Sequence, residues 1–202
     1  MKRVLLHLII LILVFSCGTK IVIYNNKSEN PKKEVKSKKE KQRKKKSKNL
    51  VVTVPKILNT EDYVKYYSSI AMDEMIQFSI PASITLAQGI LESGYGQGTL
   101  AKKANNHFGI KCHKGWKGKS ISHDDDEKGE CFRSYKNPLR SYKDHSLFLV
   151  ERDRYSSLFK LNRKDYRSWA IGLKAAGYAT DPKYAEKLIS LIERYKLNRF
   201  DE

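Results

Sequence analysis

From residue 54 onward, the spacing of hydrophobic and polar residues predicts a mainly helical domain. Hydrophobic side chains recur at steps of three to four residues, the period of an α-helix, in several separate stretches. Two shorter runs, 107–112 and 131–135, have the apolar content or the alternation of β-strands. The pattern therefore predicts an α+β, mainly α fold, with a small β-lobe inserted after the second helix. The expected helices cover residues 60–78, 81–93, 98–105, 139–152, 165–176 and 182–195.

The second of these helices carries an acidic residue near its C-terminal end. The stretch 81–93 is apolar around most of its circumference, with Pro81 expected in its first turn, and such a helix is usually buried. Burial and the negative end of the helix both disfavour a charged carboxylate, so both raise the pKa of Glu92. Since a general acid must hold its proton near neutral pH, Glu92 is a candidate catalytic acid. The alternative is a glutamate that merely emerges into solvent.

The first residues have the pattern of a secretion signal. Lys2 and Arg3 precede an apolar run, 4–15, which is shorter than the roughly 20 residues that a membrane-spanning helix needs. The run ends at the sequence Val-Phe-Ser-Cys-Gly, which resembles the cleavage box of bacterial lipoproteins. We expect a signal peptide over 1–16 and lipidation of Cys17; an ordinary signal peptide followed by a chance cysteine is the alternative.

The chain has a formal net charge of +18, and most of it lies outside the predicted domain. Thirteen basic and three acidic residues fall between Lys20 and Asn49, and after a short apolar stretch, 21–24, the segment 25–49 is almost free of hydrophobic residues. Such a segment cannot bury enough apolar surface to fold, so we expect a disordered tether over 17–53. It is either a solvated spacer or a spacer that also adheres to anionic lipid or wall polymer. Behind a lipidated cysteine, a nucleic-acid partner is not expected.

Four motifs of the predicted domain resemble those of one enzyme family. They read Leu-Glu-Ser-Gly-Tyr-Gly (91–96), Asn-Asn-His-Phe-Gly-Ile-Lys (105–111), Phe-Arg-Ser-Tyr (132–135) and Gly-Tyr-Ala-Thr-Asp-Pro-Lys-Tyr-Ala (177–185). In this order and spacing they resemble the bacterial peptidoglycan N-acetylglucosaminidases of glycoside hydrolase family 73, which include flagellar and autolysin domains. The resemblance implies a lysozyme-like glucosaminidase domain over 54–202, with Glu92 as the general acid.

The resemblance places a second catalytic carboxylate in the β-lobe, before the Phe-Arg-Ser-Tyr motif. The segment 123–130 holds five acidic residues there. We rank Glu127 first as the catalytic partner, followed by Asp126 and Asp125, and a charged, solvated turn is the alternative for each. The 2-acetamido group of the substrate can also assist, which makes a second carboxylate less essential.

Aromatic residues supply the remaining site candidates. Tyr178 and Tyr184 match the tyrosines of the fourth motif, which borders the cleft of the family, and we count them among the catalytic candidates. Packing in the core is the alternative role for aromatic residues of this kind. The expected substrate-binding residues are Tyr95, Asn106, Phe108, Trp116 and Tyr135.

Two cysteines remain besides Cys17. Cys112 and Cys131 fall at the end of one predicted strand and the start of the next, so a disulfide that closes the β-lobe is a reasonable expectation in an oxidising periplasm. The histidines have no compact ligand spacing with them, and we expect no metal and no cofactor.

The sequence pattern at the N-terminus predicts a lipid-anchored protein, and the resemblance implies a hydrolase that cleaves the β-1,4 bond between N-acetylglucosamine and N-acetylmuramic acid in peptidoglycan. Its expected partners are glycan strands and, through the N-terminal lipid, a membrane; a monomer facing the periplasm is expected. Gly18 is not an acidic retention residue, which favours the outer membrane. The alternatives are a lytic transglycosylase of lysozyme-like fold and a non-catalytic wall-binding lipoprotein.

Overall fold

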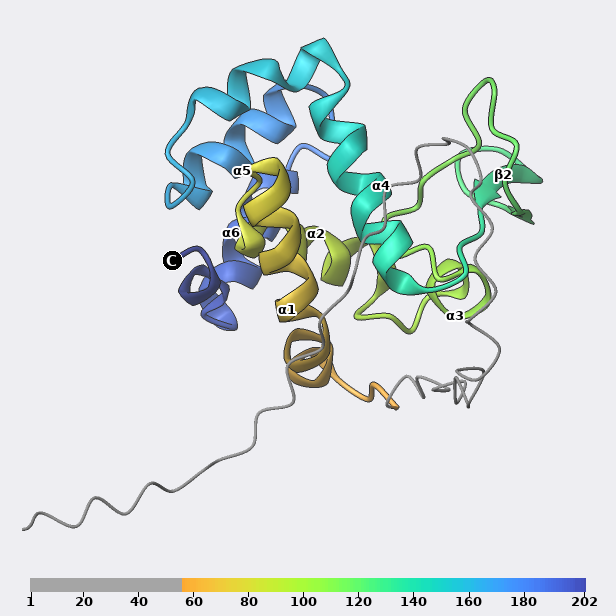
Figure 1. Cartoon of the computed structure of the whole chain (residues 1–202), viewed down its shortest axis with the longest axis horizontal. Coiled ribbons are helices and arrows are strands. Elements are labelled where there is room, and N and C mark those ends of the chain that lie inside the picture. Colours follow the sequence, from red (N-terminus) through yellow and green to blue (C-terminus); the bar gives the residue numbers. More distant parts are fainter. Residues whose placement is uncertain (1–55) are drawn as a thin grey trace, which may run out of the picture. The chain divides into compact units, whose positions relative to one another are not determined.

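The computed structural model describes residues 56–202, and Figure 1 shows how their elements are arranged. The predicted signal peptide, the whole predicted tether (17–53) with Cys17, and the first two residues of the predicted domain (54–202) lie outside the described residues. Within residues 56–202, no helix is both long and apolar enough to cross a membrane. The elements are α1 (Thr60–Phe78), α2 (Ala82–Ser93), α3 (Thr99–Ala104), β1 (Ser120–His123), β2 (Glu130–Arg133), α4 (Pro138–Val150), the 3₁₀ helix η1 (Asp153–Lys160), α5 (Tyr166–Ala175), α6 (Tyr184–Arg194) and the 3₁₀ helix η2 (Leu197–Phe200).

Helix α2 lies at the centre of the helical part. It packs against α1, α5, α6 and η2, which surround it in Figure 1. Every residue from Ala82 to Ile90 is buried, as the apolar circumference of this stretch predicts. The prediction of a buried second helix is therefore confirmed. Because its neighbours enclose it on several sides, α2 is a rigid support for the residues at its C-terminal end.

The helix ends follow local capping chemistry. The side chains of Asn59, Asn137 and Asp165 each accept a hydrogen bond from a backbone N–H in the first turn of α1, α4 and α5. Pro81, expected in the first turn of α2, instead occupies the preceding cap position. The first helix is confirmed with the predicted ends, and the other predicted helices are confirmed with ends that differ by at most two residues. The two 3₁₀ helices were not predicted, and in η1 the buried residues Tyr155 and Leu158 show the three-residue spacing of that helix type.

The β-lobe is a two-stranded antiparallel sheet in which Ile121 lies opposite Phe132. Strand β2 confirms the run predicted over 131–135, whereas the strand predicted over 107–112 is wrong. Gly109 adopts a left-handed backbone (φ 60°) that interrupts the extended run. The Asn106 side chain bonds both the N–H and the carbonyl of Ile110, which leaves only an isolated bridge between Lys111 and Phe132.

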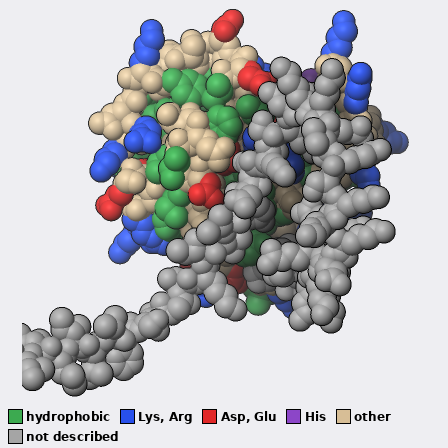
Figure 2. Space-filling view, viewed as in Figure 1, with side chains coloured by type: hydrophobic (Ala, Val, Ile, Leu, Met, Phe, Trp, Pro, Cys, Tyr) green, Lys and Arg blue, Asp and Glu red, His purple; other side chains and the backbone are tan. Residues whose placement is uncertain are grey.

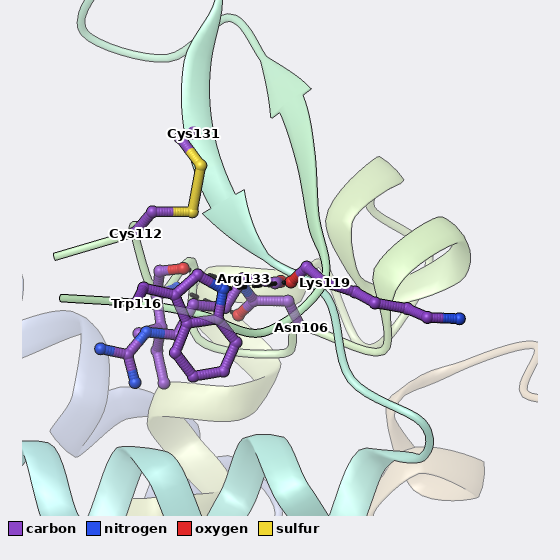
Figure 3. The surroundings of a disulfide bond; sticks show 7 residues. Asn106, Cys112, Trp116, Lys119, Cys131 and Arg133 are labelled. Carbon is purple, nitrogen blue, oxygen red and sulfur yellow. Dashed lines mark hydrogen bonds between the residues drawn. A yellow bond between two sulfur atoms is a disulfide. The ribbon is translucent and has the colours of Figure 1, made fainter.

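A disulfide joins Cys112 to Cys131 and closes the lobe, as predicted. Figure 3 shows it linking strand β2 to the segment after the third helix. The Cys112 N–H also donates to the carbonyl of Cys131 at 2.8 Å. Beside the bond, the Arg133 guanidinium lies 4.3 Å from the ring centre of Trp116. The lobe, which has few buried residues, is thus held by a covalent link and by ring stacking.

Candidate active site

The C-terminal end of α2 places Glu92 at a cleft. Gly94 follows the helix in the left-handed conformation (φ 53°) that commonly ends helices. The Ser93 hydroxyl donates to the carbonyl of Gly89 and accepts the N–H of Gly96 at 2.7 Å, which fixes the turn. Because α2 is buried and its end is capped in this way, the position of Glu92 is set by the core of the domain.

The cleft has a volume of about 460 Å³ and lies between the end of α2 and the β-lobe. Its walls come from five regions: the end of α2, the start of α3, the segment after α3, the β-lobe, and the packed aromatic face of α4 with the loop before α6. The lining residues are Glu92, Ser93, Gly98, Thr99, Leu100, Ala101, Phe108, Gly109, Ile110, Lys111, His113, His123, Asp125, Phe132, His145, Phe148, Tyr178 and Ala179.

Two tyrosines predicted from the fourth motif do lie beside Glu92. The hydroxyl of Tyr184, the first residue of α6, donates to Glu92 Oε1 at 3.2 Å and accepts a hydrogen bond from Gln88 Nε2 at 3.0 Å. The ring of Tyr178 stacks on Tyr184, with their centres 5.5 Å apart. Burial raises the pKa of both phenols well above the ordinary value, so both remain protonated near neutral pH.

The electrostatics of Glu92 suit a proton donor. The residue is open to solvent through the cleft, yet protein packed around the carboxyl removes much of its hydration. This loss of hydration raises the pKa of Glu92 to about 7, against a smaller lowering by the Tyr184 hydrogen bond and with a further rise from the charge of Asp125. Glu92 therefore keeps its proton over a large part of the neutral range, as the position at the end of a buried helix predicts.

Among the acidic residues of the segment 124–130, Asp125 lines the cleft together with Glu92. Glu127, ranked first from the sequence, is exposed and does not line it. Asp126 is also exposed and pairs with Lys111 Nζ at 2.9 Å. The geometry therefore favours Asp125 as the second carboxylate, the reverse of the order expected from the sequence.

The binding candidates divide into those that face the cleft and those that do not. Phe108 lines it and stacks on His145, with ring centres 4.1 Å apart. Asn106 is 1% exposed and its amide bonds backbone groups, so in this structure it supports the loop and does not face the cleft. Trp116 packs under Arg133, and the Tyr135 hydroxyl donates to Asp144 at 2.7 Å. Neither of these two residues lines the cleft.

Tyr95 follows the end of α2 and is 36% exposed, with a left-handed backbone (φ 47°). It also lies outside the set of residues that line the cleft. Its role as a sugar contact stays a prediction. The same is true of the sugar-binding roles expected for Trp116 and Tyr135.

Three histidines of the cleft were not predicted as site residues. His145 is 1% exposed, and neither of its ring nitrogens has a hydrogen-bond partner among the described residues. Burial lowers its pKa to about 3, so its ring is neutral. His113 and His123 line the cleft from the β-lobe side. The helical spacing of Tyr142, His145 and Leu149 could have placed His145 on the inner face of α4, but not at the cleft.

Comparison with known proteins identifies the family. Residues 68–197 match the family model Glucosaminidase, described as mannosyl-glycoprotein endo-beta-N-acetylglucosaminidase. The chain belongs to the glucosaminidase family. The four motifs quoted from the sequence lie within the matched residues, and so does every residue that lines the cleft.

Curated relatives of this glucosaminidase domain come from several bacteria. The exo-glucosaminidase LytG of Bacillus subtilis is 37% identical over 139 residues, which are 62% of this chain and 48% of that protein. The peptidoglycan hydrolase FlgJ of Vibrio parahaemolyticus is 32% identical over 153 residues, 70% of this chain and 49% of that protein. The chain thus spans about half the length of these relatives.

Solved structures of glucosaminidase relatives confirm the predicted fold class. The glycoside hydrolase domain of Salmonella typhimurium FlgJ is 31% identical, with a TM-score of 0.59. The superposition covers 69% of this chain and 89% of that one. A peptidoglycan hydrolase from Sphingomonas sp. A1 is 27% identical, with a TM-score of 0.61 and coverage of 70% and 92%. The fold is mainly helical and lysozyme-like, with a small β-lobe.

Proposed function

We propose that this glucosaminidase-family chain is a peptidoglycan hydrolase that cleaves the β-1,4 bond between N-acetylglucosamine and N-acetylmuramic acid. The observation that carries the proposal is the pair of carboxylates, Glu92 and Asp125, that line one cleft, where loss of hydration raises the pKa of Glu92 to about 7. The relatives, an exo-glucosaminidase and a peptidoglycan hydrolase, support the substrate class.

In this proposal Glu92 is the general acid. It donates its proton to the glycosidic oxygen as the bond to the leaving sugar breaks, because a leaving alkoxide needs that proton. A water then attacks the anomeric carbon, with Asp125 or the 2-acetamido group of the substrate assisting. Tyr184 holds Glu92 Oε1 and so orients the carboxyl toward the cleft.

The test is digestion of purified peptidoglycan with the wild type and Glu92→Gln, followed by mass spectrometry of the fragments. Glutamine keeps the shape of the side chain but has no acidic proton to transfer, so we expect a loss of about 10²–10⁴-fold in rate, the usual contribution of a general acid. Fragments with N-acetylglucosamine at the reducing end support the proposal. Fragments with 1,6-anhydromuramic ends would identify a lytic transglycosylase, and full activity of Glu92→Gln would remove Glu92 from the mechanism.

We further propose that the enzyme is a lipoprotein. The apolar run 4–15, the cysteine at its end and the basic segment after it support a signal peptide over 1–16, an acylated Cys17 and a tether over 17–53. The domain over 54–202 would then work in the periplasm from the outer membrane. Metabolic labelling with a radioactive fatty acid tests this, since Cys17→Ser should abolish incorporation.

A further inference from the structure

One lysine of the β-lobe is in contact with three carboxylates at the edge of the cleft. Lys111 Nζ lies 2.7 Å from Glu130 Oε1, 2.9 Å from Asp126 Oδ2 and 3.5 Å from Asp125 Oδ2. One oxygen from each of the three carboxylates lies within 4.8 Å of the others. Such a group of like charges repels itself unless a cation lies among them. Here that cation is the ammonium of Lys111, so the group is no vacant metal site.

The backbone of Lys111 is fixed to the strand side of the lobe. Lys111 forms a β-bridge to Phe132 in β2, and its neighbour Cys112 is joined covalently to Cys131. The carbonyl of Ile110, on the other side, accepts the N–H of Arg133 at 2.9 Å. Glu130, which opens β2, belongs to the same rigid unit. Two of the partners of Lys111, Asp125 and Asp126, lie instead on the exposed turn before β2.

That turn has few other bonds to the rest of the protein. Its hydrogen bonds are local: the Gly129 N–H donates to Asp124 Oδ1, and the Asp125 N–H donates to the carbonyl of Glu127. The Glu127 N–H donates to Glu130 Oε2 at 3.2 Å, which joins the turn to the carboxylate that Lys111 holds. Lys111 therefore ties the turn to the rigid part of the lobe, and Asp125 is the member of the turn that lines the cleft.

We propose that Lys111 is the positioning residue for the second carboxylate. Its short contacts to Asp126 and Glu130 hold the turn in place, and the longer contact to Asp125 leaves that carboxylate directed into the cleft with Glu92. The inference rests on the proposed function in one respect, the roles given to Glu92 and Asp125. Lys111 itself acts through these residues and not on the substrate.

The arrangement makes the pKa of Glu92 a reporter of the turn. The charge of Asp125 contributes to the raised pKa of Glu92. If the turn moves away, that contribution disappears and the pKa of Glu92 falls, so that Glu92 loses its proton at a lower pH. Tyr184 also bonds Glu92. The other titratable or charged groups that line the cleft with Glu92 are Lys111, His113, His123, Asp125, His145 and Tyr178.

The first experiment compares Lys111→Met, Lys111→Arg and the matched control Lys114→Met, an exposed lysine three residues further along the same lobe. We expect Lys111→Met to lower kcat by about 10²-fold, the usual effect of misplacing a catalytic group, with KM nearly unchanged. Lys111→Arg should recover part of the loss because it restores the cation, and Lys114→Met should behave as the wild type. A wild-type kcat for Lys111→Met, or an effect on KM alone, would overturn the proposal.

The second experiment measures the pKa of Glu92 in the full chain by ¹³C NMR of labelled glutamate carboxyls, with Glu92→Gln used for assignment. We expect Asp125→Asn to lower the pKa of Glu92 in the wild-type background and to change it much less in the Lys111→Met background, where Asp125 is no longer held near Glu92. Comparing Asp125→Asn between the two backgrounds cancels the direct effect of removing the Lys111 charge, which by itself raises the pKa of Glu92. An equal fall on Asp125→Asn in both backgrounds would overturn the role of Lys111. Since this titration needs no turnover, it remains decisive even if the chain fails to digest peptidoglycan and the proposed function is wrong.

Discussion

Two neighbours act in opposite directions on the proton of Glu92. Burial and the charge of Asp125 raise the pKa of the carboxyl to about 7, whereas the hydroxyl of Tyr184 stabilises the charged form and lowers it. A general acid works only while protonated, so the proposed reaction should slow as the pH rises through about 7. The hydroxyl of Tyr184 therefore helps to set the upper pH limit of activity.

Tyr184→Phe should move this alkaline limit to higher pH. Without the hydroxyl, the charged form of Glu92 loses a hydrogen bond and its pKa rises further. The measurement is the pH profile of kcat/KM, which reports the free enzyme. Tyr155→Phe is the matched control, since the buried Tyr155 hydroxyl has no hydrogen-bond partner among the described residues. An alkaline limit that stays in place, or moves down, would show that Tyr184 does not act on Glu92.

For single residues, the sequence predicts some members of the candidate site and not others. Glu92 could be predicted because a single acid ends a buried helix, and a local pattern reveals that. Asp125 could not be separated from Glu127, because five neighbouring acidic residues look alike in sequence. Which one lines the cleft depends on contacts of Lys111 with Asp126 and Glu130, residues 15 and 19 positions away.

Helices α1, α2 and α4 pack closely at Gly89, three residues before Glu92. The hydroxyls of Tyr63 on α1 and Tyr142 on α4 meet beside Gly89 of α2, where the Tyr142 hydroxyl donates to Tyr63 Oη at 2.8 Å. A Cβ on Gly89 would lie 2.5 Å from Tyr63 Oη and 3.2 Å from Tyr142 Oη. The absence of a side chain at Gly89 thus permits the approach of three helices.

Gly89→Ala should destabilise the fold by about 1–3 kcal/mol, the usual cost of overpacking a core. In Tyr63→Phe the obstructing oxygen is removed, so Gly89→Ala should cost less in that background, with a coupling of at least about 0.5 kcal/mol. Urea unfolding of the four proteins in a double-mutant cycle measures this. Strictly additive changes would mean that Gly89→Ala destabilises the fold for a reason other than contact with the Tyr63 hydroxyl.

The β-lobe depends more on cross-links than on a core. Its sheet has four residues in each strand, and Phe132 is its buried hydrophobic residue within the strands. Short isolated two-stranded sheets are marginal in water. The sequence pattern predicted the lobe but placed one strand at 107–112, where Phe108 instead packs against Tyr142 and His145 of α4.

Removing the disulfide with Cys112→Ala and Cys131→Ala should therefore destabilise the protein by about 3 kcal/mol, as expected for a closed loop of this length. Hydrogen exchange should show the loss in the lobe first, at the N–H groups of residues 112 and 133 that bond across it. The wild type under reducing conditions is the control, because it opens the loop without changing a side chain. Equal exchange rates in the oxidised and reduced wild type would contradict the prediction.

For the whole molecule, charge is distributed unevenly along the chain, between the segment 20–49 and the described residues. The face of the domain in Figure 2 carries Lys and Arg side chains around its rim, with hydrophobic and acidic side chains between them. The segment 20–49 carries a net charge of about +10 out of +18. A dispersed surface charge steers weakly, whereas a dense basic segment attracts an anionic polymer strongly and in a salt-dependent way. Sequence composition alone predicts this division.

Binding to isolated peptidoglycan should consequently depend on salt through the segment 32–48. Between 0.1 M and 1 M salt the Debye length contracts from about 10 Å to about 3 Å, so the attraction of this segment for wall carboxylates should largely disappear. Co-sedimentation with wall material measures it, using Glu92→Gln so that the wall is not digested. A variant with every Lys and Arg of 32–48 replaced by Gln keeps the length of the segment and should bind weakly with little salt dependence, as should the deletion of 32–48. If the Gln variant binds as the parent does while the deletion does not, the segment acts through its length, and its charge is not what holds the enzyme to the wall.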